Sequence, residues 1–116
     1  MTNYAHGHEA EKVAARYLRQ HGYKLYALNW RHRRAEIDIV AGAPGTGIPV
    51  FVEVKYREST NQGGGLDYIT PTKLRQMQFA AELWTSTHRY NGDYSLAAVE
   101  VSGADYAVTA FLDTIY

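Results

Sequence analysis

The chain has 116 residues, no cysteine, and equal numbers of acidic and basic side chains, twelve of each. This length suits a single domain, residues 1–116, with a hydrophobic core of its own. The lack of cysteine excludes disulfides and thiolate metal sites, and no apolar run approaches the length of a membrane span. An ordinary globular composition and a start without a signal-peptide pattern predict a soluble cytoplasmic protein.

Charge is distributed unevenly along the chain. Residues 1–60 hold nine Lys or Arg and six Asp or Glu, whereas residues 61–116 hold three and six. A basic first half suits a phosphate-binding surface, and an ordinary solvated surface explains it about as well.

The first half of the chain predicts a helix followed by three strands. Apolar residues at helical spacing predict a helix over residues 8–21, with Gly22 as its stop. Strand-like segments follow at residues 23–30 and 36–41, and the basic stretch 31–34 between them predicts a turn. Glycine and proline then separate the second strand from a third, which favours an antiparallel hairpin.

The second half predicts another helix and two more strands. Residues 58–68, with three consecutive glycines, predict a loop. Thr70 then caps a helix that runs to about residue 88. The segments 94–101 and 106–116 predict the last two strands. The order α-β-β-β-α-β-β predicts an α/β fold with a central mixed β-sheet flanked by helices.

The third strand holds an acid and a base on one face. Its sequence, "VFVEVKYR" from residue 50 to 57, alternates valines with Phe51, Glu53 and Lys55. Strand residues two apart share a face, so the valines are expected to be buried and Glu53 to lie beside Lys55. A solvent-facing pair without any chemistry is the simplest alternative.

The preceding strand, "EIDIVA", adds further carboxylates. Its alternation predicts Ile37 and Ile39 on one face and Glu36, Asp38 and Val40 on the other. If the hairpin brings Asp38 beside Glu53, the carboxylates repel each other unless a cation lies between them. Mg²⁺ favours such oxygen ligands, and Lys55 could then stabilise hydroxide or developing phosphate charge.

These segments, "AEIDIV" and "VFVEVKYR", resemble the Asp…Glu-x-Lys signature of the PD-(D/E)xK nuclease superfamily. More narrowly, the chain resembles the YraN family. The resemblance extends from about residue 7 to residue 84 and includes Gly7, Glu11, Ala14, Tyr17, Leu18, Gly22, Asn29, Arg31 and Lys73. It implies a restriction endonuclease-like fold, related to that of Holliday junction resolvases. It also implies metal-dependent cleavage of DNA, with selectivity for structure rather than sequence. Branched and nicked DNA are candidate substrates.

The resemblance also implies roles for single residues. Asp38, Glu53 and the backbone carbonyl of Val54 are expected to hold Mg²⁺ or Mn²⁺, and Lys55 is expected to be the catalytic lysine. Glu11 is expected to complete the metal and catalytic site.

Glu9 replaces Glu11 in this role if the register of the helix differs. For either acid, the alternative is a solvated glutamate in the first helical turn, where the helix dipole favours it.

Five basic residues are candidates for contacts with nucleic-acid phosphates. They are Arg31, Arg33, Arg34, Arg57 and Lys73. For the first three, the alternative is an exposed basic turn, and Arg57 has the same alternative of a solvated cation without a phosphate. Lys73 lies in the first turn of a predicted helix, where a cation opposes the dipole, and a bound phosphate could offset that local cost.

The sequence departs from the family pattern at two places. Ala35 replaces the glycine that usually precedes the acidic strand, and "YSLAAV" replaces an Arg-aromatic-Asp segment in the fourth strand. The second departure favours the alternative of a catalytically inactive module that binds nucleic acid or protein on a nuclease fold. A homodimer with paired sites would engage two DNA strands most easily.

Overall fold

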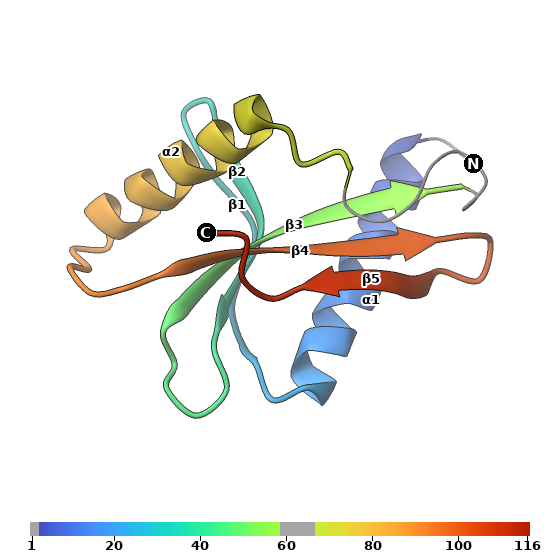
Figure 1. Cartoon of the computed structure of the whole chain (residues 1–116), viewed down its shortest axis with the longest axis horizontal. Coiled ribbons are helices and arrows are strands. Elements are labelled where there is room, and N and C mark those ends of the chain that lie inside the picture. Colours follow the sequence, from blue (N-terminus) through green and yellow to red (C-terminus); the bar gives the residue numbers. More distant parts are fainter. Residues whose placement is uncertain (1–2, 59–66) are drawn as a thin grey trace.

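The computed structural model describes residues 3–58 and 67–116, and its elements follow the predicted order α-β-β-β-α-β-β (Figure 1). The elements are α1 Asn3–Gln20, β1 Lys24–His32, β2 Ala35–Gly42, β3 Pro49–Arg57, α2 Pro71–Thr87, β4 Ser95–Ser102 and β5 Ala107–Leu112. The predicted glycine-rich loop falls largely on residues 59–66, outside the described residues. Within the described ranges, no helix is long and apolar enough to cross a membrane.

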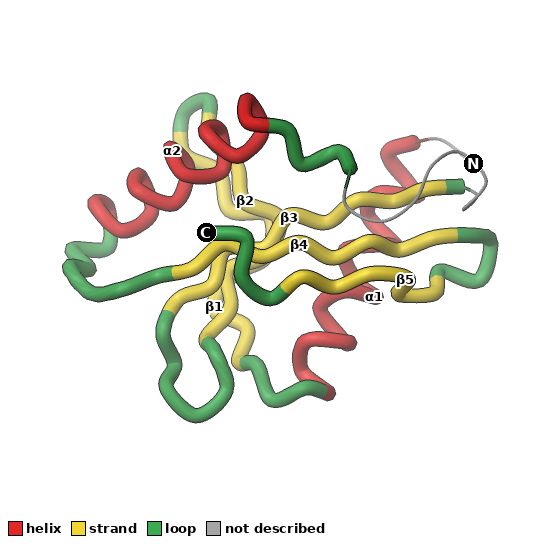
Figure 2. The backbone as a smooth tube through the Cα atoms, in the orientation of Figure 1, coloured by secondary structure: helices red, strands yellow, loops and turns green. Residues whose placement is uncertain are grey.

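The five strands form one mixed sheet in the order β1-β2-β3-β4-β5 (Figure 2). Adjacent strands are antiparallel except β3 and β4, which run parallel. A parallel pair requires a long crossover connection, and α2 lies in that connection. The predicted mixed sheet is therefore confirmed, with β3 as its central strand.

Helix α1 covers one face of the sheet. Ala10, Ala14 and Leu18 of the predicted stripe are fully buried, at the spacing of one helical face. They pack in one cluster with Val52 and other valines of β3 and β4. The chain leaves the helix as predicted, because Gly22 adopts φ 89°, a conformation that favours glycine at helix ends.

Helix α2 covers the opposite face. Met77, Ala81 and Trp84 are buried, as their helical spacing predicts, and they pack in one cluster with Phe51 of β3. Consecutive strand residues point to opposite faces, so Phe51 lies under α2 and Val52 lies under α1. The first half of β3 is therefore buried on both sides.

Three element boundaries differ from the prediction by more than one residue. Helix α1 begins at Asn3, earlier than expected, and β5 ends at Leu112, before its expected end. Strand β1 extends to His32, because this residue still pairs with Ala35 across the hairpin. Only Arg33–Arg34 of the basic stretch form the turn.

The predicted faces of β2 are wrong. Ile39 packs in the α1 cluster, whereas Ile37 packs with Val40 in the α2 cluster. Strand β2 pairs with β3 only from Ile39 to Gly42. The rest of the strand pairs with β1 alone and diverges from β3 (Figure 1). The change of face coincides with Asp38, where β2 leaves β3 while its pairing with β1 continues.

Candidate active site

The candidate site lies where β2 separates from β3. Pairing between the two strands ends at Ile39 opposite Val52, so Asp38 is the first residue of β2 beyond the ladder. Its Oδ2 atom accepts a hydrogen bond from the backbone N–H of Val54 at 2.8 Å. The side chain of Asp38 thus replaces a main-chain partner for β3, and it lies beside the Glu53-Val54-Lys55 segment.

Asp38 is partly buried in a region of negative charge. Burial raises the pKa of Asp38, and the neighbouring carboxylate of Glu53 raises it further. The hydrogen bond from Val54 lowers it, while Glu11 and Glu36 add smaller increases. Together these effects raise the pKa from 3.8 to about 7. A carboxyl group that ionises with such difficulty is one that a bound cation would stabilise in its charged form.

Glu53 is held from the side of α2. Its Oε1 atom lies 3.0 Å from Nζ of Lys73, in the first turn of that helix. Thr70 is the predicted N-cap, and its hydroxyl accepts a hydrogen bond from the backbone N–H of Lys73 at 3.1 Å. The ion pair with Glu53 therefore offsets the unfavourable interaction between the Lys73 cation and the helix dipole. From the sequence, a bound phosphate was the candidate for this role.

Lys55 is exposed and lies near the ring of Tyr68. Its Nζ atom is 5.8 Å from the centre of the ring, within the range of a cation–π interaction. The hydroxyl of Tyr68 is buried without a hydrogen-bond partner among the residues that the structure describes. Burial, followed by the charges of Glu53 and Glu100, raises the pKa of Tyr68, so the phenol remains protonated. Sequence analysis missed Tyr68, because a single tyrosine between a loop and a helix carries no periodic signal.

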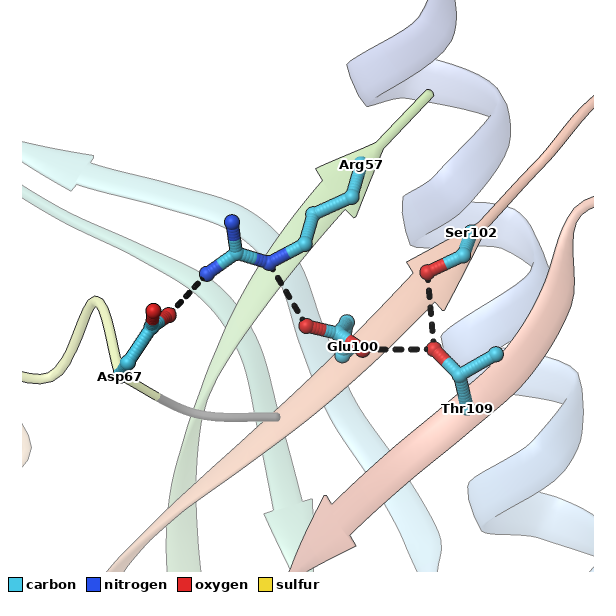
Figure 3. Close-up of polar contacts among 5 residues, drawn as sticks. All are labelled: Arg57, Asp67, Glu100, Ser102 and Thr109. Atoms are coloured by element: carbon cyan, nitrogen blue, oxygen red, sulfur yellow. Dashed lines mark hydrogen bonds and ion pairs between the residues drawn. The ribbon is translucent and has the colours of Figure 1, made fainter. Parts of the chain in front are cut away.

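Arg57 takes part in a polar network at the end of β3 (Figure 3). Its Nε atom donates to Oε2 of Glu100 at 2.7 Å, and its guanidinium also pairs with Asp67. Glu100 is only 2% exposed, and its second oxygen accepts a hydrogen bond from the hydroxyl of Thr109 at 2.7 Å. The hydroxyls of Thr109 and Ser102 lie 2.8 Å apart.

This network gives Arg57 partners within the protein. The side chain is 14% exposed, and a buried carboxylate such as Glu100 depends on its partner charge. Arg57 was predicted to contact nucleic acid, and in the structure its guanidinium pairs with Glu100 and Asp67. Glu100 was missed by sequence analysis, since its place beside Lys55 follows only from the parallel register of β3 and β4.

Glu11 lies on the site side of α1. It lines a cleft of about 420 Å³ together with Asp38, Glu36, Asn29 and Arg31. Burial raises the pKa of Glu11, and a hydrogen bond with the side chain of Asn29 opposes this increase. Asn29 has φ 51°, in the left-handed region that asparagine tolerates better than most residues.

The structure favours Glu11 over Glu9 as the acid of this cleft. Glu9 instead pairs with Lys12 at 3.4 Å on the exposed surface of the helix. Because α1 begins at Asn3, neither glutamate lies in the first turn, and the interpretation of a first-turn acid favoured by the helix dipole is wrong.

The acids do not form a closed metal cage. Across residues 3–58 and 67–116, no three His, Asp or Glu side chains are close enough to hold one ion. Mg²⁺ is often held by one or two carboxylates, with water and substrate phosphate at the remaining positions. Asp38 and Glu53 meet that requirement in donor type and charge, and Glu11 lies in the adjoining cleft.

The remaining basic candidates lie around the β1–β2 hairpin. Arg31 pairs with Glu36 at 3.4 Å, and both side chains are largely exposed. Arg33 and Arg34 are exposed at the turn. Arg34 also lines a second cleft of about 520 Å³, between α2 and β2, that includes Glu53 and Lys73. The basic turn therefore lies at the margin of the carboxylate cluster, which consists of Asp38 and its interacting acids Glu11, Glu36 and Glu53.

Fold and site together define a small mixed α/β protein with a carboxylate cluster where two strands of its sheet separate. The model of a family described as "Uncharacterised protein family UPF0102" matches residues 10–104. The chain belongs to the UPF0102 family, which bears out the narrower resemblance to YraN-like proteins.

Individual relatives agree with this assignment. A UPF0102 protein of Leifsonia xyli is 44% identical over 82 residues, which cover 71% of this chain and 68% of the relative. One from Mycolicibacterium smegmatis is 37% identical over 93 residues, covering 80% and 73%. A third, from Pseudomonas fluorescens, is 44% identical over 78 residues, covering 67% of this chain and 62% of that protein.

Proposed function

We propose that this protein is a metal-dependent endonuclease of the PD-(D/E)xK type, which hydrolyses phosphodiester bonds in DNA and selects DNA structure rather than sequence. One observation carries the proposal. Asp38 accepts the backbone hydrogen bond of Val54 at the point where β2 leaves β3, beside Glu53 and Lys55. The Asp and Glu-x-Lys parts of the signature therefore adjoin each other in space as well as in sequence.

Each residue of the cluster has a role in this proposal. Asp38, Glu53 and the carbonyl of Val54 would hold Mg²⁺ or Mn²⁺, and Glu11, which lines one cleft with Asp38, would bind the ion through water. When bound, such an ion lowers the pKa of water and balances charge on the phosphate. The ammonium of Lys55 stabilises negative charge that develops on the phosphate oxygens.

Neighbouring side chains would position these groups. The ring of Tyr68 lies under the ammonium of Lys55 and limits the directions in which the flexible lysine extends. The ion pair with Lys73 orients the carboxylate of Glu53. Release of Lys73 toward a substrate phosphate would free Glu53 for a metal ion, so substrate and metal would favour each other's binding.

Cleavage of labelled DNA tests the proposal. The parent protein is incubated with duplex, nicked, flapped and four-way-branched DNA in Mg²⁺ or Mn²⁺, and EDTA should abolish product. Asp38→Asn and Lys55→Ala should each reduce the rate by at least about a hundredfold, while circular dichroism stays unchanged.

Lys24→Ala is the matched control, because this exposed lysine begins β1 and no role at the site is proposed for it. It should cleave like the parent. Undiminished cleavage by Asp38→Asn or Lys55→Ala would contradict the proposal.

A catalytically inactive module that binds nucleic acid is the second candidate. The Lys73–Glu53 ion pair favours it, because a carboxylate with a lysine partner needs no metal ion. This candidate predicts DNA binding that weakens as salt rises but no metal-dependent product with any of the four DNA forms. The same cleavage assay therefore decides between the two.

A further inference from the structure

A second cleft adjoins the carboxylate cluster on the side of α2. Its volume is about 520 Å³, and its walls come from α2 and from the start of β2 at the hairpin turn. Glu53 and Lys73 belong to this cleft as well as to the candidate active site. A molecule bound in it would therefore lie directly beside the proposed position of hydrolysis.

One face of α2 forms a wall of this cleft. Four exposed residues of α2 line the cleft at the spacing of a single helical face. They are Thr72, Arg75, Gln76 and Phe79. The Arg75 guanidinium makes a hydrogen bond of 3.2 Å to the hydroxyl of Thr72. This helical face is thus polar and cationic near the active site and aromatic one turn further along.

Phe79 is the unusual member of this face. It is 60% exposed, although Met77 and Ala80 next to it are buried against the sheet. A phenylalanine has no polar atom to hydrate, so its exposed ring offers a flat apolar surface to a partner. The cleft is also lined by cations, Arg34, Lys73 and Arg75, which outnumber its carboxylates, Glu36 and Glu53. Cations beside an exposed aromatic ring are the combination that binds single-stranded nucleic acid.

We propose that this cleft binds one or two unpaired nucleotides of a DNA substrate, with a base stacked on Phe79 and phosphates contacted by Arg34 and Arg75. The inference rests on the proposed nuclease function and specifies its substrate as DNA with a single-stranded segment next to the cleaved bond. In continuous duplex the faces of the bases are stacked on each other, so Phe79 would have no base to contact. The guanidiniums fit a polyanion better than an apolar protein segment.

Binding is measured by fluorescence anisotropy with a labelled twelve-nucleotide oligothymidylate and with a blunt duplex of the same length. All proteins carry Asp38→Asn and are kept in EDTA, so that no cleavage occurs. Phe79→Ala should weaken binding of the oligothymidylate roughly tenfold and that of the duplex by less than about twofold. Phe79→Trp should restore it, and Arg75→Ala should reduce the dependence of binding on salt.

Tyr116→Ala is the matched control, because Tyr116 is also 60% exposed and does not line the cleft. It should bind like the parent. Equal binding of the oligothymidylate by Phe79→Ala and the parent, or equal losses on both DNAs, would overturn the inference.

The two proposals can fail separately. If the protein cleaves DNA but Phe79→Ala binds normally, the nuclease proposal stands and the nucleotide cleft is wrong. If Phe79 is needed for oligothymidylate binding but no DNA form is cleaved, the cleft stands and hydrolysis is wrong.

Discussion

The two halves of β3 differ although they belong to one strand. Val50–Val52 is buried and paired on both edges, by β2 and β4. Glu53–Arg57 keeps its pairing with β4 but loses β2, and its side chains are less buried. Loss of one neighbour thus converts a core strand into a surface that holds charges.

The comparison also shows how the open half is stabilised. Where the main chain of β2 is no longer available, the side chain of Asp38 accepts the hydrogen bond of Val54. At the end of the strand, Arg57 and Glu100 form an ion pair below the surface. Val54 and Tyr56 still pack against the α1 cluster, but charged groups make the other contacts of this half. The open half is therefore expected to respond to charge and pH more than the closed half does.

The largest expected effect concerns Arg57. Arg57→Ala leaves Glu100 buried without its cation, and breaking such a pair costs about 3–5 kcal/mol. The free energy of unfolding is measured by urea denaturation. The double variant Arg57→Met with Glu100→Met should recover most of the loss, because apolar residues of similar size commonly replace a buried pair without penalty. A loss below about 1 kcal/mol in Arg57→Ala would show that the network contributes little.

The next prediction compares the two halves directly. Val52→Ala, in the closed half, should lower the free energy of unfolding by about 2–3 kcal/mol, because it removes buried methyl groups and leaves a cavity. Lys55→Ala, in the open half, should change it by less than about 0.5 kcal/mol while reducing the cleavage rate by at least about a hundredfold. Urea denaturation of both variants together with the cleavage assay checks this. Comparable losses of stability would mean that the open half is also structural core.

The smallest expected effect is a dependence on pH. Because the pKa of Asp38 is raised to about 7 in the folded protein, the folded state keeps a proton that the unfolded chain releases near pH 4. The free energy of unfolding of the metal-free protein should therefore fall as pH rises between these values. Asp38→Asn keeps an oxygen for Val54 and should remove this decrease. At pH 8 it should be more stable than the parent, by on the order of 1–2 kcal/mol.

Thermal and urea unfolding between pH 4 and 8 in EDTA checks this prediction. Asp93→Asn serves as the control, since Asp93 is an exposed residue in the turn before β4. Parallel profiles for the parent and Asp38→Asn would contradict the prediction.

Local sequence determined most of the fold. The periodicity of apolar residues defined the helices and strands, and Thr70 and Gly22 acted as predicted at the helix ends. The proximity of Asp38 to the Glu53-Val54-Lys55 segment could also be predicted from the sequence, because a short hairpin connects the two strands. These features depend on residues that are close in the chain, so their spacing is informative.

Only the tertiary structure decided the surroundings of the carboxylates. The docking of α2 brought Lys73 to Glu53, and the parallel register of β3 and β4 brought Glu100 beneath Arg57. Where β2 separates from β3, Ile37 and Ile39 pack in different clusters on opposite faces of the sheet. Such contacts join segments that are distant in the chain, and they depend on how the sheet pairs and twists, which periodicity alone does not encode.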